Sequence, residues 1–170
     1  MEAKFSQRIK DVISYSKEEA IRLGNSFIGT EHLFLGILRE GEGIAIDLLN
    51  SLGIDLSKIK NEIENYIKAD KPLPVNETDN LPLYKSAERV LRLVYLVARD
   101  FKAETINTGH LLLAILKDDN SIVYKIFSDM SVSYETIKEE MKRMIPQAKS
   151  DFPDEDGPRG SFNGTQGGGQ

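Results

Sequence analysis

The stretch that decides the fold is Thr30–Leu38, TEHLFLGIL, which returns 78 residues later as Thr108–Leu116, TGHLLLAIL. In each copy the threonine is suited to the N-cap of a helix, because its hydroxyl can accept a free backbone N–H of the first turn. The residues that follow are apolar on nearly every side of a 3.6-residue helix, which predicts a helix inside the protein. Such a helix must be enclosed by amphipathic neighbours, and its second appearance predicts a second enclosure.

The similarity between the two copies extends well beyond this motif. With the same shift and no gap, Phe5–Ile67 aligns with Leu83–Ile145. Most apolar positions stay apolar while the surface residues differ, which indicates a duplicated unit. Identical pairs along the alignment are Val12 and Val90, Ala20 and Ala98, Ile28 and Ile106, Ile44 and Ile122, and Ile59 and Ile137.

Each unit contains the pattern of four helices joined by short loops. In the first unit, apolar residues at helical spacing predict a helix from Ser6 to Gly24, and the central helix ends near Gly41. A third helix runs between Gly43 and Gly53, and a fourth, capped by Asp55 or Ser57, carries a stripe of Leu56, Ile59, Ile63 and Ile67. The predicted organisation is repeat 1 at 1–68, a proline-containing linker at 69–80, repeat 2 at 81–146 and a flexible acidic and glycine-rich segment at 147–170.

The first helix of the second unit is apolar over more of its circumference than its counterpart. Leu93, Tyr95, Leu96 and Val97 add to the expected face, so we expect this helix to pack both inside its own unit and against the other copy. The sequence therefore predicts an all-α fold in which two tandem four-helix repeats form one domain with pseudo-twofold symmetry. The composition of Ser150–Gln170 predicts a disordered tail, which would tether the domain to a longer chain.

Composition and charge narrow the function classes. The chain has 170 residues, of which 40% are hydrophobic and 29% charged, as in soluble globular proteins. A net charge of −5 disfavours nucleic-acid binding, and the absence of cysteine excludes disulfides and cysteine catalysis. No apolar run approaches the roughly 20 residues that cross a bilayer, and Met1–Lys4 leads into an amphipathic pattern without a signal-peptide core. We expect a cytoplasmic protein that binds neither nucleic acid nor membrane.

Three segments together resemble a known family: Glu18–Gly24 (EEAIRLG), Gly29–Gly36 (GTEHLFLG) and Gly41–Ala45 (GEGIA). They look like the duplicated N-terminal Clp repeat domain, above all that of bacterial ClpC-type AAA+ unfoldases, and the resemblance covers Phe5–Ile145. It implies a domain that sits ahead of two ATPase modules and collects protein substrates and adaptor proteins. The assembled hexameric ring would then feed a protease. A stand-alone adaptor made of the same repeats, without ATPase modules, is the alternative.

The sequence contains no sign of catalysis. A Gly-x-x-x-x-Gly-Lys-Ser/Thr loop is absent, so ATP and Mg²⁺ are expected only in the modules beyond this fragment, and we expect the isolated domain not to be an enzyme. His32 and His110 lack ligands at zinc spacing and have no nucleophile beside them, which disfavours both a metal site and a small hydrolase. We interpret both as packed histidines with one ring nitrogen bonded to backbone.

The resemblance also implies a binding site for phosphorylated arginine. In ClpC-type domains the glutamate of the Gly-Thr-Glu-His motif binds the guanidinium, and a hydroxyl residue at a nearby helix start receives the phosphate. Carried over to this chain, these are Ser6, Thr30 and Glu31. The simpler interpretation of Glu31 is an acidic residue in a first turn, which the helix dipole favours by roughly 0.3–1 kcal/mol. In the second copy Gly109 replaces the glutamate and Tyr84 the hydroxyl residue, so at most one pocket is expected.

Overall fold

Eight helices and two short strands make up the part of the chain that the computed structural model describes, residues 3–74 and 80–144. In chain order they are β1 Lys4–Phe5, α1 Gln7–Arg22, α2 Thr30–Glu40, α3 Ile44–Ser51, α4 Leu56–Ile67, α5 Lys85–Asp100, β2 Thr105–Ile106, α6 Thr108–Ile115, α7 Ile122–Asp129 and α8 Tyr134–Met144. The all-α prediction is confirmed. The segment 147–170 and the middle of the predicted linker lie outside the described residues.

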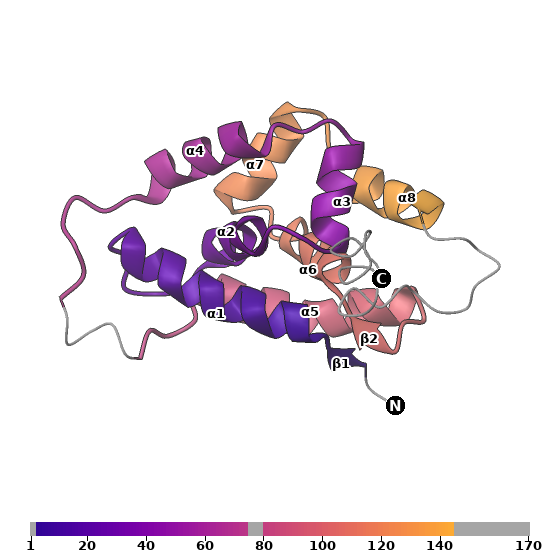
Figure 1. The fold of residues 1–170 in the computed structure, drawn as a ribbon, viewed down its shortest axis with the longest axis horizontal. Coiled ribbons are helices and arrows are strands. Elements are labelled where there is room, and N and C mark those ends of the chain that lie inside the picture. Colours follow the sequence, from indigo (N-terminus) through magenta and orange to yellow (C-terminus); the bar gives the residue numbers. More distant parts are fainter. Residues whose placement is uncertain (1–2, 75–79, 145–170) are drawn as a thin grey trace, which may run out of the picture.

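The two central helices are buried, as the sequence predicted. From Leu33 to Ile37 and from Leu111 to Ile115, no side chain is more than 1% exposed. They lie in the middle of the molecule with the other helices around them (Figure 1). Both belong to a single hydrophobic cluster, so the two repeats share one core.

The N-caps of these helices lie one residue earlier than predicted. Gly29 caps α2 and Asn107 caps α6, so Thr30 and Thr108 are the first helical residues. The difference arises because the histidine at the third helical position closes the first turn itself, by accepting the N–H of the cap residue. The threonine hydroxyls are thereby left to make contacts with the other repeat.

The start of each repeat pairs with the loop before the other repeat's central helix. β1 and β2 run parallel, with Phe5 opposite Ile106. At the equivalent place, an isolated parallel bridge joins Ile28 to Leu83. The same contact therefore occurs twice with the roles of the repeats reversed, which is what pseudo-twofold symmetry requires.

The third helix of each repeat packs chiefly on the other repeat. α3 lies against α6 and α8, whereas α7 lies against α2 and α4 (Figure 1). Phe34 of α2 and Phe127 of α7 meet edge to face, with ring centroids 5.6 Å apart. The sequence predicted two four-helix units packed as one domain. It did not indicate that the third helix of each unit would contact the central helix of the other, as α7 contacts α2 and α3 contacts α6.

The helix with the wide apolar face, α5, does contact both repeats. It packs on α6 of its own repeat and on α2 of the other, and the Tyr95 ring stacks on Phe5 at 5.4 Å. Leu96 is the exception, with 48% of the residue exposed.

Within residues 3–74 and 80–144, no helix is both long and apolar enough to span a membrane.

Candidate functional site

Glu31 lies in the first turn of α2, and its carboxylate reaches a second helix. Its Oε2 accepts the backbone N–H of Ile122, the first residue of α7, at 3.3 Å. Ser121 caps the same helix by accepting the N–H of Tyr124. A carboxylate at this place is favoured by the free N–H groups and dipoles of two helices. Glu31 therefore has a structural role across the repeats, whether or not it also binds a ligand.

Thr30 is buried beside Glu31 and joins the two repeats. Its hydroxyl donates to Asp118 Oδ2 at 2.6 Å and lies 3.3 Å from Ser86 Oγ at the start of α5. The equivalent hydroxyl, that of Thr108, accepts the N–H of Ala45 in α3 at 3.0 Å. The hydroxyl side chain that the structure brings to Thr30 is thus Ser86, from the other repeat.

Ser6 is at the opposite end of the α1–α2 pair. Its side chain caps α1 through Ile9 N–H, and its own N–H donates to Ile106 O just before α6. The two helices are antiparallel, since Arg8 near the start of α1 pairs with Glu40 at the end of α2 at 2.6 Å. The 11 residues of α2 therefore separate Ser6 from Glu31 by about 15 Å. The structure does not bring Ser6 together with Thr30 and Glu31.

The exchange between repeats divides the expected binding groups over two places. Beside Glu31 is the start of α5, where Tyr84 occupies the N-cap without a side-chain capping bond and is 53% exposed. Beside Ser6 is the start of α6, where Gly109 lies. The carboxylate end thus lacks the small hydroxyl cap residue, and the hydroxyl end lacks the carboxylate. Sequence reasoning missed this because it paired residues of one repeat.

An exposed aromatic pair completes the Glu31 end of the domain. The rings of Phe27 and Tyr84 lie 4.9 Å apart, and Phe27 is 37% exposed. A Cβ built on Gly29 would lie 3.0 Å from Glu31 Oε1 and 3.7 Å from the Phe27 ring, so the carboxylate and the ring flank the same glycine. This arrangement can accept a planar cation, which pairs with the carboxylate and stacks on an aromatic face. The signal in the sequence that could have indicated it is Phe27, two residues before Gly29.

Both histidines have the structural role that the sequence predicted. His32 Nδ1 accepts the N–H of Gly29 at 2.8 Å, and His110 Nδ1 accepts that of Asn107 at 3.0 Å. His32 Nε2, which carries the proton in this tautomer, lies 2.7 Å from Asn25 Oδ1. Burial lowers the pKa of His32 to about 4 and that of His110 to about 3, so both rings are neutral near pH 7.

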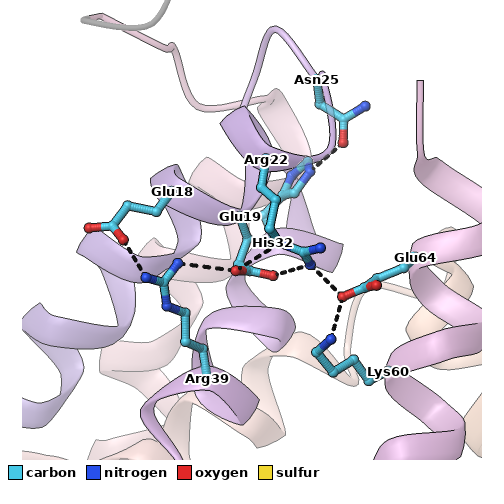
Figure 2. A network of polar contacts seen from close by, with 8 residues as sticks. All are labelled: Glu18, Glu19, Arg22, Asn25, His32, Arg39, Lys60 and Glu64. Atoms are coloured by element: carbon cyan, nitrogen blue, oxygen red, sulfur yellow. Dashed lines mark hydrogen bonds and ion pairs between the residues drawn. The ribbon is translucent and has the colours of Figure 1, made fainter. Parts of the chain in front are cut away.

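A network of ion pairs holds α1, α2 and α4 together next to His32 (Figure 2). Buried Glu19 pairs with Arg22 at 2.6 Å and with Arg39 at 3.1 Å, and Arg22 also pairs with Glu64. The hydrogen bond to Glu19 raises the pKa of Arg22. Burial acts to raise the pKa of Glu64, but its hydrogen bonds to Lys60 and Arg22 outweigh burial and lower that pKa. Repeat 2 has Val97 in place of Glu19, which removes the centre of the network. These ion pairs link three helices of repeat 1.

No group of three or more histidine, aspartate or glutamate side chains within the described ranges is placed to hold a metal ion.

The chain is similar to known proteins along most of its length. The sequence model of the Clp repeat (R) N-terminal domain matches residues 4–120 and 85–162. Chaperone protein ClpB of Oceanobacillus iheyensis is 33% identical over 150 residues, which are 88% of this chain and 18% of that protein. The Bacillus subtilis negative regulator of genetic competence ClpC/MecB is 30% identical over 145 residues, 85% of this chain and 17% of that protein.

The fold has a match among solved structures. The Hsp104 N-terminal domain from Candida albicans superposes with a TM-score of 0.68 at 18% identity, covering 83% of this chain and 91% of that one. The chain spans less than a fifth of the length of these two curated relatives. With the duplicated helices and the family match over both repeats, the chain belongs to the Clp repeat N-terminal domain family.

Proposed function

We propose that this domain docks protein substrates and adaptor proteins for a ClpC-like AAA+ unfoldase that feeds a Clp protease in the bacterial cytoplasm. The observation that carries the proposal is the match of the family's sequence model to both repeats, supported by relatives that include a ClpC and a ClpB chaperone. The domain acts as a non-catalytic receptor, and ATP is used by modules further along the chain. A gene that continues past Gln170 into a phosphate-binding loop supports this function, whereas a stop codon there supports a stand-alone adaptor.

The docking function is tested by titrating the 170-residue chain into a fluorescently labelled protein that is held unfolded by reduction and carboxymethylation. We expect saturable binding to the unfolded protein and none to the same protein in its native, disulfide-bonded state. Equal binding of both forms, or of neither, contradicts a role in collecting unfolded substrates.

We also propose that the Glu31 end binds one guanidinium ligand per domain, of which phosphoarginine is the first to test. Glu31 Oε1 lies over Gly29 beside Phe27, and Tyr84 and Ser86 stand at the neighbouring start of α5. A carboxylate matches a guanidinium fork, and a helix N-terminus favours a phosphate. Ser6 takes no part in this site, because it lies at the other end of α2.

Calorimetry with phosphoarginine and with arginine measures this site. Glu31→Gln should weaken binding about ten- to a hundredfold, the loss expected for a charge-assisted contact of roughly 1.5–3 kcal/mol. The matched control is Glu135→Gln, which removes an exposed acidic residue from the first turn of α8. Two equal sites, or affinity unchanged by Glu31→Gln, would return Glu31 to its structural role at α7.

A further inference from the structure

Repeat 2 contains an open groove on its surface. It lies between α5 and the end of α6, with a cavity of about 590 Å³, a volume within the range of protein clefts that hold ligands. Val90 and Ala114 form its buried floor, and Leu93 and Leu96 rise from α5 along one side. The groove therefore presents apolar surface to solvent. It lies on the wide apolar face of α5, which the sequence predicted to pack on two sides.

The equivalent place in repeat 1 is closed by close helix packing. A Cβ at Gly36 of α2 would lie 2.5 Å from Val12 O and from Ser16 Oγ of α1, so the two helices approach at a distance that only glycine allows. The residue equivalent to Gly36 is Ala114, and the one equivalent to Ser16 is Val94. Because both positions carry larger side chains, α6 cannot approach α5 as closely as α2 approaches α1.

The side chains that cover the surface of repeat 1 are also replaced. There Arg39 lies over the Tyr15 ring at 4.9 Å and pairs with Glu18 at 2.6 Å. The residues 78 positions later are Lys117, Leu93 and Leu96. Leucine offers neither charge nor ring to Lys117, whose ammonium lies instead over Tyr134 of α8, 4.2 Å from the ring centroid. The apolar surface of α5 is left uncovered.

The charges at the rim indicate what fits the groove. Arg89 and Arg92 stand exposed on α5 along its edge, and neither forms an ion pair within residues 3–74 and 80–144. On the opposite edge Asp118 is already bonded to Thr30 and to Asn120 N–H, and Asp119 beside it is exposed. In a chain of net charge −5, the edge that carries Arg89 and Arg92 is a local cationic site. It complements carboxylates.

We propose that the α5–α6 groove docks a short protein segment in which apolar side chains alternate with acidic ones. The proposal rests on the docking function above and assigns it a surface and a ligand chemistry. Ser86–Leu96 spans about 15 Å of helix, which an extended segment of about five residues matches. The apolar side chains fill the cavity over Val90 and Ala114, and the carboxylates pair with Arg89 and Arg92.

A charge-swap experiment on the full chain tests this. The probes are two fluorescein-labelled peptides, GELEFLEDEG and its cationic form GKLKFLKKKG, measured by fluorescence anisotropy. We expect the wild-type chain to bind the acidic probe at least about tenfold more tightly than the cationic one. Arg89→Glu with Arg92→Glu should reverse that preference, and Leu96→Asp should weaken both probes. The side chains concerned are exposed, and reversal by the cationic probe shows that the double variant is folded.

Matched controls separate the groove from general charge effects. Lys10→Glu changes an exposed cation of α1, and Tyr66→Asp changes an apolar side chain that is 70% exposed on α4. Neither should alter probe binding appreciably, because neither residue lines the groove. If the variants and the controls behave alike while the carboxymethylated protein still binds, the groove proposal fails and the docking function stands. If neither the probes nor the unfolded protein bind, both fail.

Two further outcomes would assign another occupant and overturn the proposal. Tighter probe binding by a chain truncated after Pro146 would mean that the acidic stretch at 151–156 competes for the groove. A dimer in sedimentation velocity that Leu96→Asp dissociates would mean that a second copy fills it. We expect unchanged affinity and a monomer.

Discussion

Gly109 occupies a point on α6 where a side chain has no room. A Cβ there would lie 2.8 Å from Ile44 Cγ2 and 2.8 Å from Met141 Cε, both closer than real Cβ contacts allow. At the same point of α2, Glu31 projects to the start of α7. The asymmetry between the two central helices is therefore fixed by packing, and a glutamate at position 109 would have to displace α3.

Gly109→Ala should accordingly destabilise the domain by about 1–3 kcal/mol, the usual cost of overpacking a core. Chemical denaturation followed by circular dichroism measures it. Glu139→Ala, an exposed change on α8, is the control with an unaltered midpoint. An unaltered midpoint for Gly109→Ala would show that Ile44 and Met141 move aside.

The two buried histidines predict an acid limit to stability. In the unfolded chain a histidine takes up a proton near pH 6.5, whereas the folded domain protonates His32 only near pH 4 and His110 near pH 3. Their contribution is fully present above about pH 6.5. Below it, the unfolded state binds more protons, so stability falls by about 1.4 kcal/mol per pH unit for each histidine.

Urea unfolding between pH 7.5 and 4.5 measures this slope. His110→Gln should remove about half of it, because glutamine at the third helical position can still accept the N–H of the cap residue but does not titrate. A slope that is unchanged in the double variant His32→Gln, His110→Gln would assign the acid sensitivity to other groups.

At the scale of the helix, the equivalent helices α3 and α7 are followed by different residues in the two repeats. After α3 the chain turns through Gly53 at φ 72°, and after α7 it makes the same turn through Ser131 at φ 62°. A non-glycine residue in this left-handed conformation costs roughly 1–2 kcal/mol. Glycine, in repeat 1, is therefore the more favourable residue for this left-handed turn.

Exchanging the two residues tests that comparison. Ser131→Gly should raise stability by about 1 kcal/mol, since the relief of strain outweighs the entropy that glycine loses on folding. Gly53→Ser should lower it by a similar amount, because nothing lies within 4 Å of a Cβ at Gly53 and only the backbone conformation changes. Midpoints that move in the same direction for both variants would contradict the conformational explanation.

For the whole molecule, the exchange of segments between repeats predicts strong interdependence of the halves. Produced separately, 1–78 and 79–170 each lack the third helix and the pairing strand that the other half supplies. We expect each half to be mostly unfolded at micromolar concentration and an equimolar mixture to recover helical circular dichroism. Independent folding of either half would mean that its third helix can return to its own repeat.

The sequence predicted the elements better than their partners. Periodicity was sufficient for the helices and for the burial of Leu33–Ile37, because an apolar pattern reports that a face is covered. It does not report which copy covers it, since equivalent helices carry equivalent faces. The family resemblance grouped Ser6 with Glu31, whereas in the structure Ser86 contacts Thr30 and Tyr84 contacts Ile28 at this end of α2. The groove could not be predicted, because the replacements of Gly36 by Ala114 and of Glu18 by Leu96 matter only where α1 contacts α2 and α5 contacts α6.

The parallel pairing at Phe5–Ile106 and at Ile28–Leu83 also bears on the origin of the domain. In an ancestor with a single copy, these contacts and the exchanged third helices could form only between two identical molecules, as a twofold homodimer. The folded fraction would then have fallen with dilution. Duplication and fusion through residues 69–80 placed the partner permanently at an effective concentration of roughly millimolar. Once folding no longer required two equal chains, the second copy was free both to lose its glutamate and to open a groove.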